Sequence, residues 1–205
     1  MKKLFNILTL LLFLFLLSFF IYTIFDKNTS KGTPDITSGN VDVKVNNDEK
    51  NIIQQVAEKK AGVIDLSNKG LTSVPNEVIQ NKALSVLNLS NNSITSLPSQ
   101  VENWTNMESF NIANNRLNSL VGEIRRWQKL KSLDASGNGM TGLPAEIGQL
   151  PNLRILNLSD NSLTELPNEL QNLTGLITLD LRGNPIKADH LQRLKDALIS
   201  TQILY

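Results

Sequence analysis

Residues 153–173 read LRILNLSDNSLTELPNELQNL and decide the fold, because leucines recur in them at short, regular intervals on both sides of Asn161. Leu156 and Leu158 lie two residues apart, the period that sends both side chains to one face of a short strand. A unit this short cannot bury its own leucines. The stretch therefore predicts a strand and a turn that are stable only against neighbouring copies.

The same pattern recurs every 23 residues with no insertion. A constant period of this length is typical of a solenoid, in which stacked units share one continuous core. We therefore predict about six repeats over residues 61–188. Their equivalent first positions are Ala61, Leu84, Met107, Leu130, Leu153 and Leu176.

The unit pattern, L-x-x-L-x-L-x-x-N-x-L-x-x-L-P-x-x-I-x-x-L, resembles the repeat of the leucine-rich-repeat family along the whole array. The resemblance implies an α/β solenoid with a parallel β-sheet on its concave face and turns or short helices on its convex face. It also implies that one asparagine in each unit bonds to neighbouring backbone groups, which builds a structural ladder. These asparagines are Asn92, Asn115, Asn138, Asn161 and Asn184.

The concave sheet is the usual binding face in the resembled family, so the side chains that point out of its strands are the candidate contacts. A central polar column crosses all six units, and charged residues at its margins would steer a protein partner. The candidate partner-binding residues are Asp65, Asn88, Asn111, Asp134, Asn157 and Asp180 in the column, and Glu108, Lys131, Arg154 and Arg182 at its margins.

Three residues of types that often carry function are interpreted as structural. Trp104 and Trp127 occupy the unit position that Leu150 and Leu173 hold in later repeats, so we predict that both indoles are buried. His190 is the only histidine and is interpreted as a surface residue. One histidine without any cysteine cannot assemble the usual zinc ligand set.

Both flanks of the array are predicted to close its ends, because terminal coils would otherwise expose leucines to water. In residues 48–60, apolar side chains recur at helical spacing, which predicts an N-terminal capping helix. Residues 189–205 are predicted to form a C-terminal capping helix and a tail, with Leu191, Leu194 and Leu198 on one helical face.

The chain begins with the short tail 1–3, which is followed by the uncharged and mainly apolar run 4–25. As a helix this run would extend roughly 33 Å, enough to cross a hydrocarbon core of about 30 Å. We predict a transmembrane signal-anchor helix. The alternative is a cleaved secretory signal, although this run is longer than usual for one and lacks a small-x-small cleavage site. Residues 26–47, which contain few large apolar side chains, are predicted to be a flexible linker.

The charges around the apolar run bear on its orientation. Lys2 and Lys3 favour a cytoplasmic N-terminus, whereas Lys27 and Lys31 oppose it and are partly offset by Asp26. We predict a single-pass membrane protein with a cytoplasmic N-terminus and extracytoplasmic repeats. Secretion after signal cleavage is the alternative.

The composition argues against several classes of function. A formal net charge of +1, from 20 Lys and Arg against 19 Asp and Glu, disfavours a nucleic acid partner. The absence of Cys removes disulfides, thiolate nucleophiles and zinc–cysteine sites. No Gly-rich phosphate loop is present, and no carboxylates pair outside the repeat column. We therefore predict no cofactor, no metal and no catalysis.

These features predict a membrane-anchored leucine-rich-repeat protein that recognises a protein or another macromolecule. The alternative is a structural protein of the cell envelope or cell surface that associates with itself. Extracellular animal and plant members of the resembled family commonly carry Cys-paired caps. Their absence favours a bacterial source.

Overall fold

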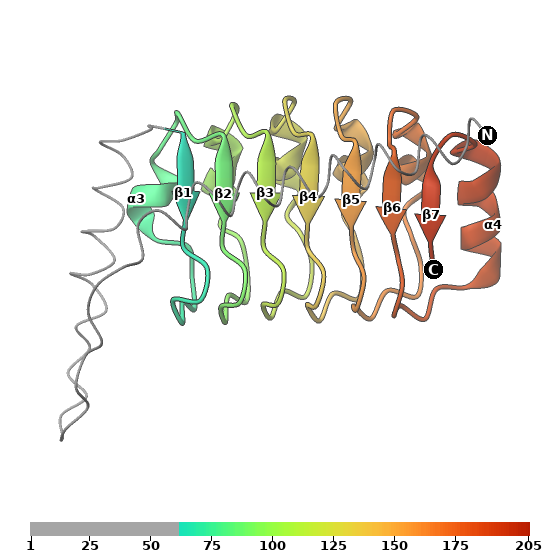
Figure 1. The fold of residues 1–205 in the computed structure, drawn as a ribbon, viewed down its shortest axis with the longest axis horizontal. Coiled ribbons are helices and arrows are strands. Elements are labelled where there is room, and N and C mark those ends of the chain that lie inside the picture. The colour runs from blue at the N-terminus through green and yellow to red at the C-terminus, as the bar shows by residue number, and fades with distance from the viewer. Residues whose placement is uncertain (1–61) are drawn as a thin grey trace, which may run out of the picture. The chain divides into compact units, whose positions relative to one another are not determined.

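The computed structural model describes residues 62–205, which form one parallel sheet of seven strands with helical turns between them. Figure 1 shows the strands side by side in chain order from β1 to β7, with most helical segments behind them. Of residues 62–205, no helix has the length and apolar character to cross a membrane. The predicted tail 1–3, transmembrane helix 4–25, linker 26–47 and capping helix 48–60 lie outside the described residues.

Each strand has three residues and pairs in parallel with the next strand. From β1 to β6 every residue pairs with the one 23 positions later, so the sequence period sets the register. In these six strands the middle side chain is buried in the core. They are β1 (Val63–Asp65), β2 (Val86–Asn88), β3 (Ser109–Asn111), β4 (Ser132–Asp134), β5 (Ile155–Asn157) and β6 (Thr178–Asp180).

The helical turns each follow an extended residue, which is proline in four units and Val121 in one. Proline suits this position because its ring holds φ near −65° and it needs no partner for a backbone N–H. The carbonyl of this residue accepts the first hydrogen bond of the turn. The turns are α3 (Asn76–Ile79), η1 (Ser99–Asn103), η2 (Gly122–Arg126), η3 (Ala145–Gln149) and η4 (Asn168–Asn172).

Two indoles fill the core behind the central strands, which confirms the prediction that they are buried. Trp104 and Trp127 have no exposed surface, and their ring centroids stack 5.8 Å apart. Phe110 meets both rings edge-on. Each indole N–H donates to a helical turn of the preceding unit, at 3.1 Å to the Val78 carbonyl and 2.8 Å to the Val101 carbonyl.

The asparagine of each unit bridges two neighbouring coils. Asn115 Nδ2 donates at 3.0 Å to the Leu89 carbonyl of the preceding unit and at 3.0 Å to the Ile112 carbonyl of its own unit. Its Oδ1 accepts from the Ile94 N–H at 2.9 Å. Buried backbone groups need such partners, because without them they lose hydration and gain nothing in return. Equivalent bonds are made by Asn92, Asn138, Asn161 and Asn184.

The C-terminal end contains a helix and, after it, a strand that the sequence analysis missed. Helix α4 (Ala188–Ala197) buries Leu194, and β7 (Gln202–Leu204) then pairs with β6. Thr178 pairs with Gln202, a step of 24 residues, because α4 and its loop replace a shorter helical turn. Residues assigned to a tail therefore extend the sheet by one strand.

His190 has a structural role that its interpretation as a surface residue did not include. Its side chain is 15% exposed, and its Nδ1 accepts a hydrogen bond at 3.3 Å from the Leu166 N–H. The imidazole thereby satisfies a backbone donor of the last full repeat and ties α4 to it. The sequence did not reveal this contact because it does not show which turn lies opposite the helix.

Replacing Asn161 by Ala should lower the free energy of unfolding by about 2–4 kcal/mol. The change leaves buried backbone groups without hydrogen-bond partners, and each such group costs about 1–3 kcal/mol. Asn161 is 7% exposed and bonds to Ala135, Leu158 and Met140. Urea denaturation measures the change. The control is Asn118→Ala, because Asn118 is exposed. Equal small losses in both variants would contradict a stabilising ladder.

Candidate functional site

The parallel register brings the predicted central column together on one face of the sheet. Asp65 pairs with Asn88, and the same register continues strand by strand to Asp180. A second column precedes it by two residues and runs from Val63 to Thr178, and its side chains are half-buried. We call the side chains of these two columns, which alternate with the buried middle residues, the exposed sheet face.

Every side chain of the central column is engaged by the chain itself. In each unit its Oδ1 accepts a hydrogen bond from the backbone N–H two residues later, at 2.8–3.1 Å. This is the local turn that Asn and Asp form where a strand ends. The column that sequence reasoning assigned to partner contacts therefore terminates the strands. Its second polar atom is what remains for a partner, except in Asp180.

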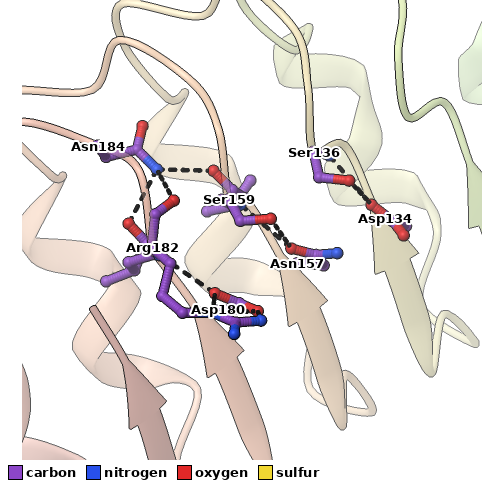
Figure 2. Close-up of polar contacts among 9 residues, drawn as sticks. Asp134, Ser136, Asn157, Ser159, Asp180, Arg182 and Asn184 are labelled. Carbon is purple, nitrogen blue, oxygen red and sulfur yellow. Dashed lines mark hydrogen bonds and ion pairs between the residues drawn. The ribbon is translucent and has the colours of Figure 1, made fainter.

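Hydroxyl groups reinforce two of these turns, as Figure 2 shows. Ser136 donates to Asp134 Oδ1 at 2.7 Å, and Ser159 donates to Asn157 Oδ1 at 2.8 Å. These contacts hold the acceptor side chains in one rotamer. Restraint of these two side chains before a partner arrives lowers the entropic cost of binding.

At the C-terminal end of the column an ion pair replaces the hydroxyl (Figure 2). Arg182 Nε donates to Asp180 Oδ1 at 3.0 Å, and its Nη2 donates to Oδ2. Burial by itself raises the pKa of the Asp180 carboxyl, but the hydrogen bonds and charge of Arg182 outweigh burial and lower the pKa. The same contacts raise the pKa of Arg182. Both oxygens of Asp180 are therefore occupied.

The predicted charged residues at the margins lie at opposite ends of the strands. Glu108, Lys131 and Arg154 each precede a strand, whereas Arg182 follows one. Lys131 Nζ lies 2.7 Å from Glu108 Oε2 on an exposed surface, where such a pair stabilises the fold little. Arg154 donates to the Gly175 carbonyl at 3.0 Å. The register brings the first three together at the start of the strands and leaves Arg182 at the opposite strand end.

The described residues offer no metal centre. Across residues 62–205, His, Asp and Glu side chains do not gather in groups of three or more that would hold a metal ion. What the sheet face presents is a row of small polar groups in a regular array.

The geometry defines a class, the stacked-repeat solenoid with one open sheet face. Comparison with known families identifies the repeat. Two family models of the leucine-rich repeat match residues 83–104 and 128–186. The chain is therefore a leucine-rich-repeat protein. Among curated proteins, none matches it significantly.

Several solved structures share the fold. A leucine-rich-repeat protein of Leptospira interrogans is 36% identical with a TM-score of 0.64, and the match covers 66% of this chain and 34% of that protein. An internalin of Listeria monocytogenes is 21% identical, with a TM-score of 0.58 over 64% of this chain and 37% of that protein. This chain thus spans well under half of the length of both proteins.

A plant receptor provides a further match. The leucine-rich-repeat ectodomain of the membrane receptor kinase GASSHO1/SCHENGEN3 from Arabidopsis thaliana was solved in complex with Casparian strip integrity factor 2. It is 27% identical with a TM-score of 0.58, and the match covers 66% of this chain and 17% of that protein.

Replacing Arg182 by Gln should raise the pKa of Asp180 and reduce stability mainly near neutral pH. A carboxyl whose pKa is lowered by folding stabilises the protein above its unfolded pKa of about 3.9, and this stabilisation is lost as the pH falls through the folded pKa. Urea denaturation at neutral pH and near pH 3 tests this. The deficit of Arg182→Gln should shrink in acid, whereas that of the control Arg154→Gln should not. Equal deficits at both pH values would refute the assignment.

Proposed function

We propose that the repeats form a non-catalytic recognition module whose exposed sheet face binds a protein partner. One observation carries the proposal: within residues 62–205 the seven-stranded sheet has helical turns on one side and no covering layer on the other. Because adjacent units keep constant register, this face offers an extended surface of pre-positioned groups. Such an arrangement suits recognition by shape and hydrogen bonding.

The contacts are expected to come chiefly from the column that begins each strand. Its members Ser109 and Ser132, on the two central strands, make no side-chain hydrogen bond within the described chain, so their hydroxyls are available. The predicted column of Asn88, Asn111 and Asn157 contributes its Nδ2 donors, since each Oδ1 is already in use. Glu108 and Lys131 lie at the margin of the face, just before their strands, where charge affects association rate more than affinity.

We propose further that residues 4–25 anchor the module in a membrane and that residues 26–47 tether it. The support is the length and apolar character of the first segment, together with the polar composition of the second. The two lysines before the span support a cytoplasmic N-terminus and extracytoplasmic repeats. A tether of this kind leaves the sheet face free to meet a partner at the surface.

The double variant Ser109→Arg/Ser132→Arg should block the sheet face and leave the fold intact, since both side chains point outward. Affinity capture from cells that make the protein, read by quantitative mass spectrometry, should recover at least tenfold less partner, roughly the loss of one interface hot spot. The matched control is Ser96→Arg/Ser162→Arg, which adds the same charge at exposed positions outside the sheet. Equal recovery with both double variants would exclude this face.

The absence of cysteine allows a topology test without background labelling. In the single variant Ser96→Cys, a membrane-impermeant maleimide should label intact cells, and the labelled chain should stay with the membrane after carbonate washing. The unchanged chain, which has no thiol, is the control. Labelling only after lysis would overturn the orientation, and a shortened chain released from the membrane would support cleavage instead of anchoring.

A further inference from the structure

A second surface lies apart from the sheet face, where the helical turns end and the chain passes to the next strand. It contains a pocket of about 790 Å³ that spans four consecutive units. The size is within the range of about 300–1,000 Å³ that is usual for ligand sites. We call it the basic pocket, and four cationic side chains line it: Lys82, Arg125, Arg126 and Lys129.

These cations stand out because acidic side chains do not neutralise them. Residues 62–205 contain 12 Lys and Arg and 13 Asp and Glu, so the described chain has nearly balanced charge. A third of its cations nevertheless line this one pocket, against the single carboxylate of Glu102. In the part of the chain that the structure describes, none of the four forms an ion pair, although Lys131, Arg182, Lys187 and Arg193 all do.

Two of the four cationic side chains make no hydrogen bond or ion pair with the described residues. Lys129 Nζ donates to Asn106 Oδ1 at 2.8 Å, and Arg125 makes a long contact of 3.5 Å to the Gly122 carbonyl. Lys82 and Arg126 donate to no acceptor among the described residues. Their charges are therefore available to an anion from outside the chain.

The backbone beneath these side chains is held by amides from the following units. Asn106 Nδ2 donates to the Lys82 carbonyl at 3.0 Å, and Asn152 Nδ2 donates to the Gln128 carbonyl at 2.7 Å. Gln128 Nε2 in turn donates to the Gln149 carbonyl at 3.1 Å. The segments that carry the cations are thus fastened to each other. A ligand would meet a preorganised frame, which lowers the cost of binding.

We propose that the basic pocket binds an anionic oligosaccharide that carries sulfate or phosphate groups. Guanidinium groups match the oxygens of these anions in geometry and charge. The neutral lining groups of Asn103, Thr105 and Gln149 supply donors and acceptors for sugar hydroxyls. The span across four units suits a chain of sugars better than a single ion.

Two other polyanions fit the pocket less well. Single-stranded nucleic acids need aromatic side chains on which bases stack, whereas no aromatic residue lines the pocket and both tryptophans are fully buried. Anionic membranes are bound most firmly when apolar side chains also insert. The exposed large apolar residues of the described chain are Ile177, Ile199 and Tyr205, and none lines the pocket.

Fluorescence anisotropy with the full chain and a labelled, sulfated heparin octasaccharide tests the proposal at about 150 mM salt, where charges more than about 8 Å apart are largely screened and non-specific attraction is weak. The unchanged protein should bind this probe and ignore a neutral maltooligosaccharide of similar length. The variant Lys82→Gln/Arg126→Gln should bind at least about tenfold more weakly, because charge-assisted hydrogen bonds are lost. Both positions are exposed, and circular dichroism verifies the fold.

The matched control is Lys69→Gln/Arg116→Gln, which removes the same charge from exposed positions outside the pocket. It should bind as tightly as the unchanged protein. An equal loss in the control, or no binding by the unchanged protein, would overturn the proposal. Tighter binding of a single-stranded oligonucleotide, or of vesicles rich in anionic lipid, with the same sensitivity to Lys82 and Arg126 would reassign the pocket to that ligand.

Discussion

The whole array depends on satisfying backbone groups that stacking removes from water. Each coil turns sharply after its strand, and the turn is then covered by its neighbour. The asparagine of each unit solves this problem by donating to two carbonyls, one in its own coil and one in the preceding coil, and by accepting an N–H. Because one side chain serves two coils, any change of period would break bonds on both sides. The constant spacing and the parallel register are consequences of this requirement.

The sequence predicts this part of the fold well because its cause is local and repeated. Alternation of Leu156 and Leu158 defines the buried side of a strand, and repetition defines which strands pair. Features that depend on a single contact between distant residues were missed. The bond from the Trp127 indole to Val101 requires the three-dimensional stack, and so does the contact of His190 with the Leu166 N–H. Strand β7 follows a 24-residue step and lacks the Leu-x-Leu pattern, so periodicity did not reveal it.

The candidate site illustrates a different limit of sequence reasoning. The central column was correctly placed on one sheet face, yet its side chains also end the strands through contacts with the backbone two residues later. A signal for this role is present, since Asn or Asp at the end of a strand commonly forms such a turn. Regular occurrence in every unit points to the same conclusion, because recognition rarely needs identical groups at each step. The column that begins the strands varies more, with valine, serine, isoleucine and threonine, and is where specificity is expected to reside.

The stacking principle also explains how one short solenoid can carry two separate surfaces. Strand, turn and helical segment recur in each unit, so any unit position that is free of core duties forms a row along the array. On the sheet face the rows hold short side chains, three of them the carboxylates of aspartates, that suit close contact. In the basic pocket, the row formed by the ends of the helical turns holds long cations, and amide ladders support their backbone. The core leucines and ladder asparagines are separate from the pocket cations and from the column that begins the strands, so substitutions at those positions can alter binding without weakening the spine.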